Sequence, residues 1–297
     1  CGAIMTERYT PDMSVIHHSH MLKDKIRLDK YKKAISETIA PHDNVVDIGS
    51  GCGILSMLSA QKTTGQVYGI EYFGFAISLS KELCNKKDNI EFIKNSSFQT
   101  SLSDHIHAIV TETIGQIGPE EHMVEAIWDF CRRHPSIEKV IPAKLSIFAQ
   151  PVHSAWFDEF RLEKFLSYNA LSEYNMSSKE ADYIINDYLG RIIFQHDLSS
   201  SHIIDTDTST MLTSYKLGVT ASSSFTKIIK ISECHTPPAN ALHLYFETEL
   251  NPDNILDTHY SSPLTHWQHS FVLIPPGKQS ATISYRAGDR FISCEWE

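Results

Sequence analysis

Apolar and polar residues follow different periods in the two halves of the chain. The first half opens with "MLKDKIRLDKYKKAISETI", where Met21, Ile26 and Tyr31 recur at approximate helical spacing. Four strand-like runs follow, "NVVDIG", "QVYGIE", "IEFIK" and "HAIVTE", with helical segments at 54–60 and 76–84 separating the first three. This β-α-β-α order predicts a Rossmann-like α/β domain with a parallel, doubly wound sheet that binds ligands at the carboxyl ends of its strands.

The second half predicts a separate antiparallel domain. From "VIPAKLSIFAQPV" onward, strand-like runs alternate with clusters of Ser, Thr, Pro, Asn and Gly; the later runs are "RIIFQH", "TKIIKI", "ALHLYFETEL", "HSFVLIPP" and "ATISYRA". That pattern is typical of a β-sandwich or β-barrel. Between the first run and the others, residues 156–190 look helical and carry many aromatics. We expect them to pack either within the chain or against a partner subunit.

Composition narrows the class of protein. The chain has 297 residues, of which 41% are hydrophobic, so it can bury a core in one large domain or two ordinary ones. No run approaches the ~18 apolar residues of a membrane span, and the first twenty residues are polar, so we expect no span, no signal peptide and a cytoplasmic location. The net charge of -10 disfavours nucleic acid and suits a cationic substrate. Six scattered cysteines and sixteen histidines lack zinc-site spacing, so no metal is expected.

A glycine-rich turn in "VVDIGSGCGILSM" carries the first candidate site. Three alternating glycines separate a predicted strand from a predicted helix and let a ligand approach the backbone: Gly49, Gly51 and Gly53. Asp47 precedes them, and a carboxylate there disfavours a pyrophosphate but tolerates a cationic sulfonium. Glu71, which ends the second strand, is placed to accept hydrogen bonds from ribose hydroxyls. The combination resembles the class I S-adenosylmethionine-dependent methyltransferases; a dinucleotide site and a turn without a nucleotide are the alternatives.

Carboxylates follow the fourth predicted strand, in "TETIGQIGPEEHM". Glu112 ends the strand, and Glu120 and Glu121 follow a loop that glycines interrupt. Two carboxylates from one loop can hold a planar guanidinium through paired N–H bonds, although solvated loop charges are the simpler interpretation. Further on, "SSPLTHWQHSF" places an aromatic and polar cluster, residues 265–267, between a proline turn and a strand. This cluster indicates a second part of the site.

With these motifs the chain resembles the protein arginine methyltransferases over nearly its whole length. In that family a double-glutamate loop holds the substrate guanidinium, and a Thr-His-Trp loop from the β-barrel domain closes the pocket. The resemblance puts Glu112 on the first glutamate position and Glu121, rather than Glu120, on the second. It implies substrate contacts from Thr265 and Trp267.

"MLKDKIR" resembles the family's N-terminal helix motif, whose arginine binds the methionyl carboxylate of the cofactor. Arg27 takes that position, and Asp24 takes that of an aspartate that pairs with the histidine of the Thr-His-Trp loop, here His266. We expect the Asp24–His266 pair either to relay the proton released by the product or to clamp the helix over the cofactor. The acid that commonly contacts the adenine amino group is absent, and Ser96 or Ser97 takes its place.

Other positions depart from the family or refine the product. The tyrosine-rich N-terminal motif is reduced to "RYTPD", with Tyr9 as its aromatic residue. The glutamate loop carries Thr113 and Gln116 where the family usually has tryptophan and tyrosine, which predicts a wider or more polar pocket. Met21 and Met123 fall where members that make asymmetric dimethylarginine have methionine, although both also suit a gap-filling core role.

The resemblance implies a complete architecture and activity. We expect an N-terminal helical segment over 1–30, a Rossmann-like cofactor domain over 31–142, a β-barrel substrate domain over 143–297, and a dimerisation arm over 156–190 that makes a head-to-tail homodimer. The cofactor would be S-adenosylmethionine and the acceptor an arginine of a protein or peptide. Free arginine or another small amine, and a non-catalytic subunit, are the alternatives; a dehydrogenase is the weakest. The expected cofactor-binding residues are Met21, Arg27, Asp47, Gly49, Gly51, Gly53, Glu71 and Ser97.

Overall fold

The computed structural model describes residues 19, 21–103, 105–159, 190–198, 202–231 and 236–297. The chain divides into two compact units. The first consists of Cys1–Thr113, Ala126–Ala143 and Leu250–Ile255, and the second of Ile114–Glu125, Lys144–Glu249 and Leu256–Glu297. Most of the expected arm at 156–190 lies outside the described residues, as does Tyr9.

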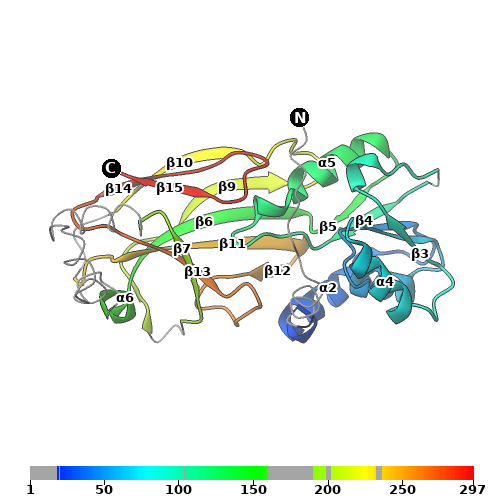
Figure 1. The fold of residues 1–297 in the computed structure, drawn as a ribbon, viewed down its shortest axis with the longest axis horizontal. Coiled ribbons are helices and arrows are strands. Elements are labelled where there is room, and N and C mark those ends of the chain that lie inside the picture. Colours follow the sequence, from blue (N-terminus) through cyan, green and yellow to red (C-terminus); the bar gives the residue numbers. More distant parts are fainter. Residues whose placement is uncertain (1–18, 20, 104, 160–189, 199–201, 232–235) are drawn as a thin grey trace, which may run out of the picture. The chain divides into compact units, whose positions relative to one another are not determined.

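The first unit contains a five-stranded parallel sheet in the order β3-β2-β1-β4-β5. Every residue of β1 and β4 is buried, as expected for central strands covered on both faces. Figure 1 shows α5 on one side of this sheet and α2 and α4 on the other. The chain runs from β2 to β3 in one direction across the sheet and from β4 to β5 in the other, so right-handed crossovers place α4 and α5 on opposite faces. The elements are α2 (Lys25–Thr38), β1 (Val45–Ile48), α3 (Ile54–Lys62), β2 (Val67–Glu71), α4 (Gly74–Leu83), β3 (Ile90–Lys94), η1 (Ser97–Gln99), β4 (Ala108–Thr111), α5 (Met123–Arg133) and β5 (Lys139–Ile141).

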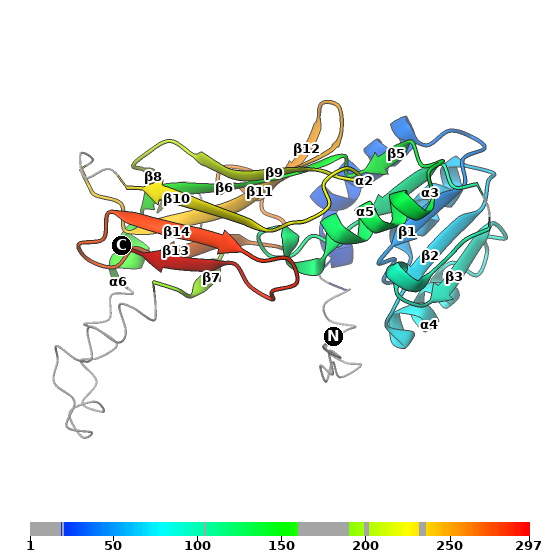
Figure 2. The same ribbon diagram turned by 90° about the horizontal axis from the view of Figure 1, so that it is seen from above.

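The second unit is antiparallel. Its strands form one sheet in the order β10-β14-β15 and another in the order β7-β13-β11-β6-β8, with β9 paired to β6 and β12 to β11. Figure 2 shows the long strands β6 and β11 side by side. The elements are η2 (Pro119–Glu121), β6 (Lys144–His153), α6 (Ala155–Glu159), β7 (Ile193–His196), β8 (Ile204–Asp205), β9 (Thr210–Lys216), β10 (Phe225–Lys230), β11 (Ala241–Asn251), β12 (Asn254–Asp257), β13 (His269–Leu273), β14 (Ser280–Tyr285) and β15 (Ser293–Trp296).

The predicted fold class is confirmed: a doubly wound parallel sheet is followed by an antiparallel β domain. The helix expected from Met21 onward is interrupted: residues 21–23 are helical, Asp24 is not, and α2 begins at Lys25. The Asp24 carboxylate accepts a hydrogen bond from the backbone N–H of Arg27 at 3.0 Å and so caps the helix. Within the described residues, no helix is both long and apolar enough to cross a bilayer.

Candidate functional site

The glycine turn after β1 has a backbone that only glycine adopts readily. Gly49 and Gly53 have φ angles of 69° and 82°. A Cβ atom on Gly49 would also overlap the methyl group of Thr113. The N–H groups of Gly49 and Ser50 both donate to the carbonyl of Ile70, at 2.9 and 3.0 Å, which ties the turn to the end of β2.

Glu71, at the end of β2, is held by the same turn. Its carboxylate accepts hydrogen bonds from the backbone N–H of Gly51 at 3.0 Å and from that of Phe73 at 2.8 Å. The side chain is buried. Two amide donors therefore fix the carboxylate that the sequence assigns to the ribose.

Asp47 lies beneath the turn as an almost completely buried acid. Its Oδ2 accepts a hydrogen bond from the Ser56 hydroxyl at 2.6 Å, whereas its Oδ1 is buried without a partner among the described residues. Burial raises the pKa of Asp47 to about 7, and the negative charges of Glu71 and Glu112 act in the same direction. A cation beside Oδ1 would stabilise the ionised carboxylate and lower this pKa. Ser56 was not foreseen from sequence; its only signal is a polar residue on the buried face of α3.

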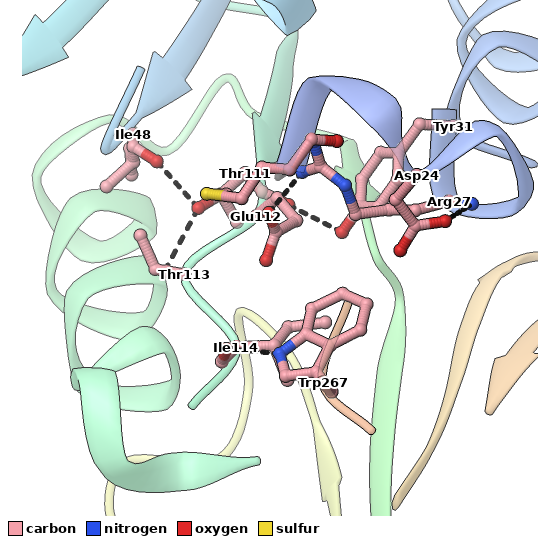
Figure 3. Close-up of polar contacts among 10 residues, drawn as sticks. Asp24, Arg27, Tyr31, Ile48, Thr111, Glu112, Thr113, Ile114 and Trp267 are labelled. Carbon is pink, nitrogen blue, oxygen red and sulfur yellow. Dashed lines mark hydrogen bonds and ion pairs between the residues drawn. The ribbon is translucent and has the colours of Figure 1, made fainter. Parts of the chain in front are cut away.

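Arg27 and Glu112 form a buried ion pair in the first unit. Arg27 is 2% exposed, and its Nη1 contacts the carboxylate of Glu112 at the end of β4. Figure 3 shows the guanidinium directed toward Glu112. Its Nη2 donates to the carbonyl of Met21 at 2.9 Å, and its Nε is buried without a partner among the described residues. The Nε–H group of Arg27 is therefore available for a ligand.

The two adjacent glutamates of η2 have different surroundings. The carboxylate of Glu120 accepts hydrogen bonds from the backbone N–H groups of Gly118, at 2.8 Å, and Ile117, at 3.1 Å. Burial raises the pKa of Glu120. Glu121, by contrast, is exposed. The loop thus uses Glu120 to hold its own backbone, which is compatible with the assignment of the second substrate carboxylate to Glu121.

The Thr-His-Trp segment lies in the second unit. Trp267 is 5% exposed, and its indole N–H donates to the carbonyl of Ile114 at 3.0 Å. The His266 ring lies over Trp267 with 3.9 Å between ring centroids. Thr265 is buried and accepts the backbone N–H of Gln268 at 3.1 Å through its carbonyl. Trp267 therefore supports the loop that follows Glu112, a contact that the sequence did not reveal.

Curated relatives match part of the chain, and no protein-family model matches it. An uncharacterised protein of Methanocaldococcus jannaschii is 31% identical over 131 residues, which are 43% of this chain and 50% of that protein. Protein arginine N-methyltransferase 6 of Danio rerio is 29% identical over 114 residues, which are 37% of this chain and 33% of the relative. The matching segment thus spans half or less of the length of these curated relatives.

Solved structures match nearly the whole chain. Arabidopsis thaliana protein arginine methyltransferase 10 superposes with a TM-score of 0.73 at 16% identity, over 97% of this chain and 99% of that one. The chain thus shares the fold of protein arginine methyltransferases and is similar in sequence to curated members of that family. The Trypanosoma brucei PRMT1 enzyme-prozyme heterotetrameric complex with AdoHcy has a TM-score of 0.71 at 18% identity, over 91% of this chain and 87% of that one.

Two positions of the glutamate loop differ from the aromatic residues usual in the arginine methyltransferase family. The Thr113 hydroxyl lies 3.2 Å from that of Thr111, and the Gln116 side-chain amide donates to the Ser270 hydroxyl at 3.3 Å. Both side chains are therefore engaged by neighbours within their own units. The family's tryptophan and tyrosine have no counterpart at these two positions.

The remaining predicted site residues are dispersed. Met123 is fully buried at the start of α5, as a core residue would be, and Ser97 lies in η1. Asp24 belongs to the first unit and His266 to the second, so their pairing stays a prediction. Within the described residues, no group of three or more His, Cys, Asp and Glu side chains is arranged to hold a metal ion.

Proposed function

We propose that this protein is an enzyme that transfers methyl groups from S-adenosylmethionine to a guanidinium nitrogen of arginine in a protein or peptide. The observation that carries the proposal is Asp47, a buried acid with an unpartnered oxygen directly beneath a turn of three alternating glycines. A buried acid there suits a cationic ligand, because it would lose stability beside a pyrophosphate. The similarity to protein arginine N-methyltransferase 6 of Danio rerio supports the same reaction.

The residues of the first unit fit the charge distribution of this cofactor. Its methionyl end carries cationic groups and a carboxylate. The buried polar atoms without a partner among the described residues include the acceptor Asp47 Oδ1 and the donor Arg27 Nε. Arg27 would hold the carboxylate, Asp47 would face the cationic groups, and Glu71 would accept the ribose hydroxyls. The structurally similar Trypanosoma brucei complex contains AdoHcy, the demethylated form of the same molecule.

The glutamates Glu112 and Glu121 are proposed to bind the substrate arginine. A guanidinium has a pKa above ~12 and a delocalised lone pair, so it is a weak nucleophile that must be oriented. Carboxylates that accept its N–H groups fix its plane and draw positive charge toward the bound edge. When bound, the cofactor supplies an electrophilic methyl group on sulfur. The Asp24–His266 pair is proposed to accept the proton that the methylated nitrogen releases.

Isotope transfer from labelled cofactor to three acceptors tests the proposal. The acceptors are an arginine-rich peptide, a basic protein and free arginine, each analysed by mass spectrometry. Label on the peptide or protein is the expected result. Label on free arginine alone would show that the substrate is the free amino acid and not a protein or peptide. No label on any acceptor, with S-adenosylhomocysteine binding retained in calorimetry, would indicate a non-catalytic subunit.

A neighbouring pair of variants tests the assignment of Glu121. Glu121→Gln should lower methyl transfer by roughly 100-fold or more, because it removes a charged acceptor from the transition state. Glu120→Gln is the matched control: it neutralises the adjacent acid, whose carboxylate bonds the loop backbone. Cofactor affinity should be unchanged in both. Equal losses in the two variants would remove Glu121 from the mechanism.

We also propose a homodimer in which residues 156–190 form the contact. The aromatic content of this segment supports the proposal. Sedimentation of the full chain should give twice the monomer mass. A monomer at micromolar concentration would contradict this assembly.

A further inference from the structure

Two buried side chains of α2 point to the end of β4 from successive helical turns. Arg27 and Tyr31 are 2% and 0% exposed, and residues four apart lie on one helix face. Arg27 pairs with the carboxylate of Glu112, whereas the Tyr31 hydroxyl donates to the carbonyl of Thr111, one residue earlier, at 3.0 Å. Figure 3 shows both contacts.

Thr111 is the last residue of β4 and pairs with Ile48 of the neighbouring β1. The β4–β5 pairing ends at Val110 and Ile141. The Thr111 hydroxyl donates to the carbonyl of Ile48 at 2.7 Å, which anchors its side chain to β1. The peptide between Thr111 and Glu112 is planar, so a bond that fixes the Thr111 carbonyl also fixes the amide nitrogen of Glu112.

We propose that Tyr31 is a positioning residue, whose hydroxyl sets the orientation of the peptide from which the Glu112 side chain extends. Arg27 holds Glu112 at its carboxylate and Tyr31 holds it at its backbone, so the glutamate is constrained at both ends. The inference rests on the proposed function, in which Glu112 binds the guanidinium. A displacement of about 1 Å in such a group can lower the rate of the chemical step by about 100-fold.

Tyr31 remains a hydrogen-bond donor at every physiological pH. Burial raises the pKa of its hydroxyl well above the usual value, and the charge of Glu112 adds to the effect. The contact therefore does not switch with pH. Any change in the pH–rate profile has to come from other groups.

Two phenylalanine variants separate positioning from general packing. Tyr31→Phe removes the hydroxyl and keeps the ring. Tyr215→Phe does the same to a matched residue of β9, which is 2% exposed and whose hydroxyl donates to the carbonyl of Ser223 at 2.7 Å. We expect Tyr31→Phe to lower kcat at least tenfold relative to Tyr215→Phe, with KM for donor and acceptor within twofold of the unaltered chain. An equal kcat in the two variants, or a rise in cofactor KM alone, would overturn the proposal.

Hydrogen exchange of residues 108–115 provides a measurement that does not depend on activity. In the full chain without substrate, exchange over this segment should be at least tenfold faster in Tyr31→Phe and unchanged in Tyr215→Phe. Unchanged exchange in Tyr31→Phe would overturn the inference whatever the activity. If the unaltered chain methylates no arginine but exchange responds as expected, the proposed function fails and the positioning of Glu112 by Tyr31 stands.

Discussion

Lowering the pH should weaken cofactor binding through Asp47. Burial raises the pKa of this acid to about 7 in the protein without ligand. A cation beside the unpartnered Oδ1 stabilises the ionised carboxylate, so binding should lower the pKa and release a proton. Because the cofactor then favours the ionised form, its affinity should fall as the pH drops below 7.

The size of the effect follows from the fraction of Asp47 that is ionised. With a pKa of about 7, about half of the molecules carry the charge at pH 7 and about 3% at pH 5.5. The affinity should therefore fall about 16-fold over this interval, or about 1.6 kcal/mol. Binding at pH 7 should release about half a proton.

Isothermal titration calorimetry with S-adenosylmethionine measures both quantities when it is repeated in buffers of different ionisation enthalpy. Asp47→Asn should bind more weakly, with an affinity that is nearly constant between pH 7 and 5.5. Ser56→Ala should move the loss of affinity to higher pH, because the Ser56 hydroxyl bonds Asp47 at 2.6 Å and lowers its pKa. Two results would refute the link between Asp47 ionisation and cofactor binding. One is an equal affinity of the unaltered protein at pH 7 and 5.5, and the other is the same change of affinity with pH in Asp47→Asn as in the unaltered protein.

Three further substitutions test contacts in the two units. Arg27→Met breaks the buried ion pair with Glu112 and should lower the free energy of unfolding by about 3 kcal/mol in urea titrations. Trp267→Phe loses the indole bond to the carbonyl of Ile114 and should cost about 1–3 kcal/mol in the same assay. Burial lowers the pKa of His243 to about 3, so the unfolded chain is protonated first as the pH falls. Folded stability should then drop by about 1.6 kcal/mol between pH 6.5 and 5, a drop that His243→Asn should reduce.

Controls for these three predictions use the same urea titrations. If Arg27→Met lowers the free energy of unfolding by less than about 1 kcal/mol, the ion pair with Glu112 contributes little to stability. A Trp267→Phe protein as stable as the unaltered chain would exclude the indole bond as a support of the loop. For His243, an unchanged pH slope in the asparagine variant would assign the acid sensitivity to other histidines.

The sequence was informative where local pattern decides structure. Central strands such as Val45–Ile48 are apolar on both faces apart from Asp47, and the glycine turn follows from backbone geometry. The helix α5 was not predicted, because it begins directly after the glutamate loop at His122, whose φ is 62°. Its stripe of Val124, Ile127 and Phe130 is fully buried.

The contacts that organise the candidate site were beyond local pattern. Tyr31 bonds a residue 80 positions away, and Trp267 one that is 153 positions away. Spacing along the chain identifies Glu112 and Arg27 as candidates for chemistry but does not show that they pair. Such partners are far apart in the sequence and meet only once the strands and helices have packed together, so local patterns do not reveal them.

The close contact between Gly49 and the Thr113 methyl couples substitutions at these two positions. Where the family usually carries tryptophan, this chain has a small β-branched residue against a backbone with no room for a Cβ atom. A tryptophan at position 113 would therefore press on this turn, unless the turn changed as well. The two positions should show strong epistasis, and grafting the consensus aromatic into this protein by itself should be harmful.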